Sequence, residues 1–149
     1  MMYHHKGFSA LPLSLKFIFI VMTLGMLSSM FYFSYISENG YPLLWFMLFG
    51  GSAIISLIIL NILLTLLLLF GMWNRSPWTW EYGIIYFGFF VINGIISFIT
   101  LLNGIDFTPS MHTGIWVNIF AILFGTILNL VFLVIMYKKR FYFEEGLRF

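Results

Sequence analysis

The strongest constraint in this sequence is a set of four long apolar runs, none of which contains a charged residue or a histidine. The runs cover residues 17–36, 44–70, 82–102 and 114–137. A helix needs about 20 apolar residues to cross the hydrocarbon core of a bilayer. Because backbone groups in lipid must bond within their own segment, and barrel-like alternation is absent, each run predicts a helix. We therefore predict an all-α integral membrane protein that is a four-transmembrane-helix bundle.

The composition excludes a soluble protein. Hydrophobic residues make up 62% of the 149 residues, charged residues make up 8%, and the mean hydropathy is +1.03. Soluble domains are about 45–50% apolar and about 25% charged, and disordered chains are more polar still. The short connections leave no room for a soluble domain, so residues 1–149 are expected to form a single membrane domain. The absence of cysteine excludes disulfides and thiol chemistry.

Turn residues mark the predicted ends of the runs. The segment Asn39–Pro42 breaks the chain before the second run, and Ser76–Pro77 and Thr108–Pro109 each place proline after a good N-cap residue. These two pairs open the third and fourth runs. The first run is too long for the apolar part of a signal peptide, and no small-residue cleavage site follows it. We therefore expect it to be retained as the first span.

The basic residues predict the orientation of the bundle. With four spans, all seven fall on one side, whereas the connections on the other side hold only Glu38 and Asp106 as charges. The positive-inside rule then places both termini in the cytoplasm. The cluster Lys138, Lys139 and Arg140 is interpreted as a topology signal that also attracts anionic lipids. Seven dispersed basic residues are too few for a nucleic-acid surface, so no nucleic-acid partner is expected.

Five tryptophans lie where the predicted spans meet the membrane interfaces. They are expected to anchor the helices at headgroup depth, with Trp73, Trp78 and Trp80 at the cytoplasmic interface and Trp45 and Trp116 at the outer one. A cation–π or ligand-binding role is the alternative interpretation of the same residues.

Between the interfaces the predicted spans contain no Asp, Glu, Lys, Arg or His. Proton coupling, voltage sensing and ion relays ordinarily require such groups, and a haem held between helices requires axial ligands such as histidine. The three histidines, His4, His5 and His112, are divided between the two sides of the predicted membrane. We therefore expect no catalytic residue, no cofactor and no metal site, and predict that the chain is not an enzyme.

The most prominent polar residues within the spans are amides. Asn61, Asn93 and Asn129 each lie eight to eleven residues from the predicted cytoplasmic end, which is roughly 12–17 Å at 1.5 Å per residue. One interpretation is a polar site at mid-membrane for a quinone, a lipid headgroup or another substrate. The other is a clasp, a set of interhelical hydrogen bonds that each contribute about 0.6 kcal/mol.

Small and polar residues share helix faces with these amides. Asn118 and Gly125 lie on the Asn129 face of the fourth span, and Ser97 lies on the amide face of the third. Ala121 and Gly125 have the small-xxx-small spacing that permits close helix approach. These residues are therefore predicted to pack helices or to line the polar site.

Two features predict contact with other subunits. Ser52 and Ser56 lie on the side of the second span opposite Asn61 and Thr65, which favours a second helix interface, with ordinary lipid-facing residues as the alternative. The tail at residues 141–149 mixes aromatic and charged side chains. We expect it to lie on the membrane surface or to be held by a neighbouring subunit.

The stretch Gly71–Trp80 has the pattern G-x-W-x-[KR]-x-x-W-x-W. It resembles the tight hairpin of many small four-span prokaryotic membrane proteins of unknown function. The resemblance covers about a tenth of the chain. It implies the bundle topology and residence in a prokaryotic cell membrane, and it transfers no active site.

These features favour a non-catalytic accessory or structural subunit that stabilises a larger membrane complex by helix packing. Respiratory oxidases and membrane monooxygenases are the expected type of assembly, with membrane lipids and other integral membrane subunits as partners. An alternative is a homo-oligomeric transporter or channel that binds a lipid or small molecule at the layer of Asn61, Asn93 and Asn129. A virion membrane protein is a lesser alternative.

Overall fold

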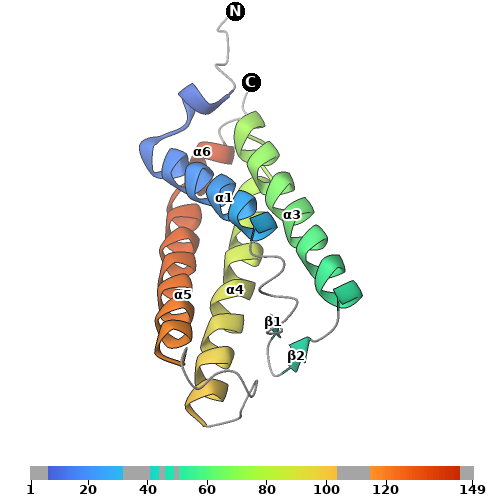
Figure 1. Cartoon of the computed structure of the whole chain (residues 1–149). Coiled ribbons are helices and arrows are strands. Elements are labelled where there is room, and N and C mark those ends of the chain that lie inside the picture. The colour runs from blue at the N-terminus through green and yellow to red at the C-terminus, as the bar shows by residue number, and fades with distance from the viewer. Residues whose placement is uncertain (1–6, 32–40, 44–45, 49–50, 104–114, 145–149) are drawn as a thin grey trace, which may run out of the picture.

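The computed structural model describes residues 7–31, 41–43, 46–48, 51–103 and 115–144, most of them helical. The elements in chain order are η1 (Phe8–Ala10), α1 (Leu13–Phe31), β1 (Tyr41–Leu43), β2 (Phe46–Leu48), α3 (Gly51–Asn74), α4 (Thr79–Leu102), α5 (Ile115–Lys138) and α6 (Arg140–Glu144) (Figure 1). Within these described residues, three stretches are long and apolar enough to cross a membrane: Ser52–Asn74, Thr79–Thr100 and Ile119–Lys138. The described apolar part of α1, Leu13–Ser28, is shorter than these. The chain is thus a helical bundle with three long apolar helices, consistent with an integral membrane protein.

The start predicted for the second span is wrong. The prediction places it at Leu44, whereas β2 occupies Phe46–Leu48 and α3 begins at Gly51. Aromatic residues suit extended strands, and glycine is a poor residue for a helix interior. The glycine pair at positions 50–51 therefore disfavours a helix that continues back into the aromatic segment. At its other end α3 continues to Asn74, four residues beyond the predicted end.

The first helix begins earlier than predicted. α1 starts at Leu13 rather than at Phe17. Pro12 precedes the helix, and its carbonyl accepts the Lys16 N–H at 2.9 Å, so the first turn forms directly after the proline. The predicted end of this span, residues 32–36, lies outside the described residues.

The third helix also begins earlier, at Thr79 rather than at Tyr82. The Thr79 N–H donates to the Ser76 carbonyl at 3.0 Å, so the turn at Ser76–Pro77 leads directly into α4. α5 covers Ile115–Lys138, compared with the predicted 114–137. The turn predicted at residues 108–109 lies outside the described part of the chain.

α4 and α5 lie antiparallel and in close contact (Figure 1). Gly83 and Gly94 of α4 face α5, because a Cβ at Gly83 would collide with Met136 and a Cβ at Gly94 would collide with Thr126. A Cβ at Gly125 would meet no atom within 4 Å. The close approach predicted at Gly125 is therefore not found among the described residues, and the glycines of α4 provide it instead.

α3 and α4 are joined by a tight hairpin and then diverge (Figure 1). The Ser76 N–H donates to the Gly71 carbonyl at 2.9 Å and the Arg75 N–H donates to the Met72 carbonyl at 3.2 Å, which is a Schellman motif. Arg75 has a φ of 55°, the left-handed conformation that this motif requires. The antiparallel pair β1–β2 lies between the separated ends of α3 and α4 (Figure 1).

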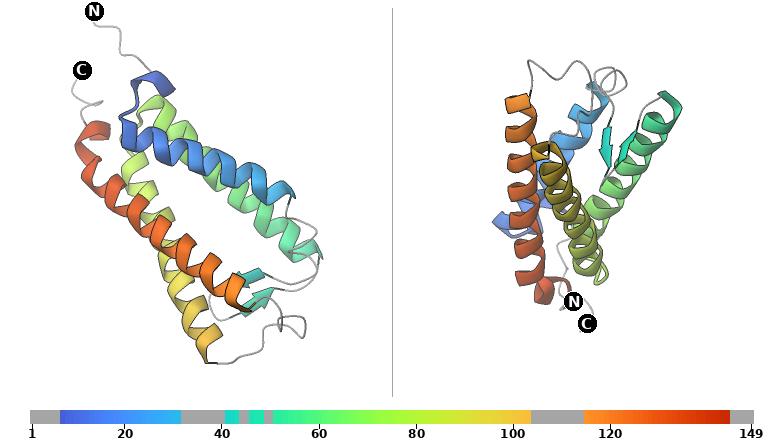
Figure 2. Two further views of the ribbon diagram at one scale, coloured as in Figure 1. Left: turned by 60° about the vertical axis from the view of Figure 1, so that its left-hand side comes forward. Right: turned by 90° about the horizontal axis from the view of Figure 1, so that it is seen from below.

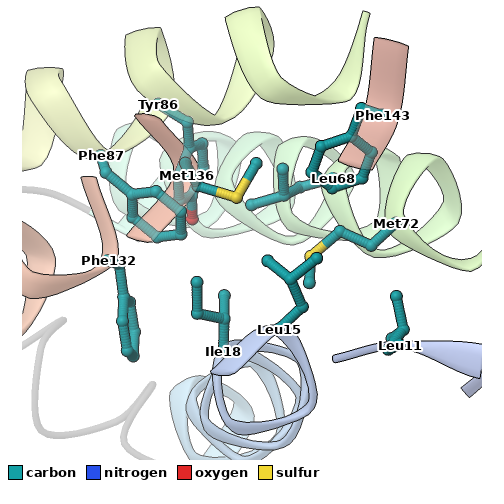
Figure 3. Close-up of a cluster of buried hydrophobic side chains, with 10 residues drawn as sticks. All are labelled: Leu11, Leu15, Ile18, Leu68, Met72, Tyr86, Phe87, Phe132, Met136 and Phe143. Atoms are coloured by element: carbon teal, nitrogen blue, oxygen red, sulfur yellow. The ribbon is translucent and has the colours of Figure 1, made fainter. Parts of the chain in front are cut away.

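A cluster of buried apolar side chains lies near the hairpin end of the bundle. Figure 3 shows its ten members: Leu11, Leu15, Ile18, Leu68, Met72, Tyr86, Phe87, Phe132, Met136 and Phe143. Phe87 of α4 packs edge-on against Phe132 of α5, with ring centroids 5.3 Å apart. Phe143 of α6 is fully buried. The start of the aromatic tail therefore belongs to the core, in contrast to the predicted position on the membrane surface.

The described ends of the chain meet at this end of the bundle (Figures 1 and 2). We name it the basic end, after the cationic residues Lys16, Arg75, Lys138, Lys139 and Arg140. The Gly7 N–H donates to the Trp73 carbonyl, and the Tyr142 hydroxyl donates to the Ala10 carbonyl, both at 3.1 Å. Contacts within the chain thus hold both described ends, whereas contact of the tail with a neighbouring subunit stays a prediction. Residues 145–149 lie outside the described part.

Candidate functional site

The three asparagines predicted to form a layer border cavities in the middle of the bundle, and each of these cavities is bordered by two of them. Asn61 and Asn93 border a groove of about 410 Å³ between α3 and α4. Asn61 and Asn129 border a cavity of about 220 Å³ among α1, α3, α4 and α5. Asn93 and Asn129 border one of about 190 Å³ between α4 and α5. Phe90 lines all three, so the structure gathers the asparagines around this ring.

The groove between α3 and α4 has predominantly apolar and aromatic walls. They consist of Leu57, Leu60 and Leu64 from α3 and of Tyr82, Ile85, Tyr86, Phe89 and Phe90 from α4. Leu60 and Ile85 are 51% and 70% exposed, so the groove opens sideways onto the apolar surface of the bundle. Small-molecule sites typically measure about 300–1,000 Å³ and combine apolar walls with a few polar groups. The α3/α4 groove fits this description.

Hydrogen bonds between side chains connect α3 and α4 beside the groove. The Tyr86 hydroxyl donates to Asn61 Oδ1 at 3.0 Å and lies 2.9 Å from Thr65 Oγ1. A phenol has one proton, so Thr65 donates to Tyr86. Closer to the basic end, the Tyr82 hydroxyl donates to the Leu64 carbonyl at 2.9 Å. These bonds hold α3 and α4 together at the base of the region where they diverge.

The direction of these hydrogen bonds orients the Asn61 amide. Asn61 Oδ1 accepts the Tyr86 proton, whereas Asn61 Nδ2 has no partner among the described residues. An amide nitrogen carries two donor hydrogens, and donors without acceptors are costly in hydrocarbon. Asn61 therefore presents donor groups beside walls that consist mostly of carbon.

The polar residues on the α5 side behave differently. Asn129 Nδ2 donates to the Gly125 carbonyl of its own helix at 2.7 Å, rather than bonding across helices as the clasp interpretation expects. Ser97 borders the same α4/α5 cavity as Asn93 and Asn129. Its buried Oγ has no hydrogen-bond partner among the described residues. The interhelical bonding of the clasp interpretation is thus found at Asn61, through Tyr86.

The other predicted residues that the structure describes are mainly at the basic end. The side chains of Trp45, Trp116 and Asn118 fall outside the described residues. At the basic end, Trp73, Trp78 and Trp80 are partly exposed. The Arg140 guanidinium lies 4.6 Å from the centre of the Trp80 ring, and Arg140 Nε donates to Glu144 Oε1 at 2.6 Å. This hydrogen bond raises the pKa of Arg140.

In the positively charged cluster predicted to attract anionic lipids, Lys138 and Arg140 are exposed and Lys139 is half-buried. Arg140 also pairs with Glu144 at the surface. Arg75, which follows α3, lies over the Tyr142 ring at 4.3 Å from its centre and donates through Nε to the Tyr142 carbonyl at 2.8 Å. Part of the positive charge therefore stabilises the tail.

Sequence reasoning missed Tyr86 and Phe90, the residues that connect the asparagines. Tyr82, Tyr86 and Phe90 recur every four residues, a spacing that places them along one side of α4. That periodicity was the available signal. It is weak, because aromatic side chains are common throughout these spans and a phenol in a span can also serve as an interface anchor.

The chemistry available at the layer is neutral hydrogen bonding and aromatic contact. Its polar groups are amides, hydroxyls and phenols. Within the described part of the chain, no three His, Cys, Asp or Glu residues are grouped so that they could hold a metal ion. The arrangement is therefore suited to holding helices together or to binding a neutral molecule.

No family model matches the chain, and neither the curated proteins nor the solved structures contain a match. The resemblance of Gly71–Trp80 to the hairpin of small four-span proteins thus rests on that motif alone. The residues of the site are the basis for any functional proposal.

Proposed function

We propose that this chain is a non-catalytic subunit that stabilises a larger membrane complex by helix packing. The outer face of α3 is the observation that supports this role most. Ser52 and Ser56 are exposed there, on the side opposite Asn61 and Thr65. The Ser56 hydroxyl donates to the Ser52 carbonyl at 2.9 Å, so its one donor hydrogen already has an acceptor. A second helix can approach such a small-residue face closely.

The interior of the bundle also supports a structural role. The hydroxyls of Thr23, Thr100 and Thr126 each donate to a carbonyl four residues earlier in their own helix. In the three long apolar stretches the charged side chains are Glu81 and Lys138, both at the basic end. Coupled transport ordinarily uses ionisable groups deeper in the membrane.

The test of this role is purification of the tagged full-length chain from native membranes in a mild detergent. We expect a stable assembly that contains redox-active or catalytic integral membrane subunits, of the respiratory oxidase or membrane monooxygenase type. The double variant Ser52→Leu/Ser56→Leu should lose the assembly, because leucine side chains keep the second helix away. Ser28→Leu makes the same change at an exposed serine of α1 whose hydroxyl donates to the Gly25 carbonyl, so it is the matched control and should retain the assembly. A homogeneous homo-oligomer that moves solute across liposomes would contradict the proposal.

We also propose four spans with both termini in the cytoplasm of a prokaryotic cell. The collection of cationic residues at the basic end supports this orientation through the positive-inside rule. Since the chain lacks cysteine, single cysteines at the exposed positions Ser9 and Asn103 can report the topology. A membrane-impermeant maleimide should label Asn103→Cys in intact cells and Ser9→Cys only after permeabilisation. The reverse pattern would overturn the orientation.

A further inference from the structure

The groove between α3 and α4 has three properties that together restrict the kind of ligand it can bind. It is bordered by polar groups far from either end of α3, its walls are aromatic and aliphatic, and it opens sideways on the bundle. Asn61 lies ten residues after the start of α3 at Gly51, which at 1.5 Å per residue is about 15 Å along the helix. In a membrane this depth is within the hydrocarbon, so a ligand has to arrive dissolved in the bilayer.

The hydrogen bonds beside the groove specify what the ligand must offer. Thr65 donates to Tyr86, and Tyr86 donates to Asn61 Oδ1, so the acceptor side of this amide is occupied. Asn61 Nδ2 remains as a donor without a partner among the described residues. The complementary group is an acceptor that carries no proton, and a carbonyl oxygen is the simplest such group in a neutral molecule.

The walls specify the shape of the ligand. The side of the groove formed by α4 presents the rings of Tyr82, Tyr86, Phe89 and Phe90. Tyr86 lies 4.9 Å from Phe90 and 6.1 Å from Tyr82, measured between ring centroids. Aromatic surfaces of this kind favour contact with another flat ring. A phospholipid does not meet both requirements, because its carbonyls lie at the interface and its acyl chains are not flat.

We propose that the α3/α4 groove binds a flat, neutral, lipid-soluble carbonyl compound of the quinone type, with a ring carbonyl accepting a hydrogen bond from Asn61 Nδ2. The binding site lies on the side of α3 opposite Ser52 and Ser56, so it is independent of the proposed subunit contact. The isolated chain should therefore bind the ligand whether or not it belongs to a larger complex.

The test uses the full-length chain in phosphatidylcholine nanodiscs, with menadione as the probe and tryptophan fluorescence quenching as the readout. Trp78 lies 5.9 Å from Tyr82 of the groove, measured between ring centroids, and serves as the reporter. We expect saturable quenching by menadione. 2-Methylnaphthalene, which has the same rings and methyl group without the carbonyls, should displace menadione with an affinity at least about fivefold weaker than that of menadione itself, as the loss of one ordinary hydrogen bond implies.

Variants connect binding to the groove. Asn61→Leu should weaken menadione binding about fivefold or more, because it removes the donor. Asn129→Leu makes the same change at an amide that does not line the groove, and it should leave the affinity within about twofold. Ile85→Trp fills the groove from an exposed position, so it should abolish binding while the bundle still folds.

Three results would overturn the proposal. The first is displacement of menadione by 2-methylnaphthalene with an affinity equal to that of menadione itself. The second is an equal loss of affinity in Asn61→Leu and Asn129→Leu when circular dichroism shows both to be folded. The third is an absence of menadione binding while methyl oleate changes the tryptophan fluorescence in a saturable way that depends on Asn61, which would assign the groove to an acyl-chain carbonyl.

Discussion

α4 meets its two long neighbours through different surfaces. Toward α5 it presents Gly83 and Gly94, and the two helices touch closely along their length. Toward α3 it presents Tyr82 and Tyr86, whose hydroxyls reach across to α3 near the hairpin, and the helices then separate. In a membrane, where lipid competes equally for apolar side chains, close backbone approach holds a helix pair tightly. The size of the interfacial side chains thus decides which pair is closed and which is open.

The largest expected effect is a difference in stability between alanine variants of two phenylalanines of α4 that point in different directions. Phe87 is fully buried and packs on Phe132 of α5, whereas Phe89 is 44% exposed at the groove. Phe87→Ala should lower the free energy of unfolding by about 3–5 kcal/mol, because it leaves a cavity. Phe89→Ala should cost less than about 1.5 kcal/mol, since little packing is lost. Denaturant titration in detergent micelles, followed by circular dichroism, measures both, and equal losses would remove the distinction between the two faces.

The next effect concerns the backbone approach itself. Gly94→Val should destabilise the bundle by about 1–3 kcal/mol, because the new side chain collides with Thr126 and pushes α5 away. Gly125→Val places the same side chain where a Cβ meets nothing within 4 Å. Thermal unfolding in one detergent compares the two. A Gly125→Val variant as unstable as Gly94→Val would show that another surface closes this pair.

A smaller effect should appear on the open side of α4. Tyr86→Phe removes the hydroxyl that connects Thr65 and Asn61. The expected loss is about 0.6–1.7 kcal/mol, which runs from the average to the largest value measured for hydrogen bonds between membrane helices. Tyr137→Phe removes a hydroxyl from a side chain that is 67% exposed, and its unfolding should match that of the unmodified protein. If Tyr86→Phe is neutral, the bonds between α3 and α4 do not stabilise the open pair.

The smallest effect is expected at the basic end, where both helix pairs are joined. Burial raises the pKa of the Tyr142 phenol, so the folded state favours its neutral form. The stability from this group is fully present below the ordinary tyrosine value of about 10 and declines as the pH rises through the raised pKa. Tyr142→Phe should lack this part of the alkaline decline. Unfolding measured at neutral pH and at several alkaline values tests it, and an unchanged pH profile in the variant would contradict it.

The long helices were predictable because their signal is strong and local. An uninterrupted apolar stretch permits few alternatives in lipid, and the layer of Asn61, Asn93 and Asn129 follows from counting residues along three helices. The start of α3 was not predictable in the same way, because hydropathy does not distinguish the strand at Phe46–Leu48 from a helix. At this position the aromatic residues favour a strand and glycine disfavours a helix interior, so these residues determine where α3 begins.

The hydrogen-bond partners of the polar residues could not be predicted from the sequence. Helix periodicity places Asn129 and Gly125 on one face, but it does not show that the Asn129 amide bonds the Gly125 carbonyl instead of a neighbouring helix. The role of Tyr86 depends on how far α3 lies from α4, which is a property of the whole bundle. The same holds for Phe143, whose burial requires α6 to fold back onto the core.

The hydrogen bond from Tyr142 to Ala10 joins residues 132 positions apart. Because the ribosome delivers Tyr142 after α1, α3, α4 and α5, this contact with Ala10 forms only once all of these helices have been synthesised. Insertion of the long helices therefore precedes the closing of the basic end. A chain interrupted before α6 could place all its long helices in the bilayer, but its Ala10 carbonyl would lack the hydrogen bond from the Tyr142 hydroxyl.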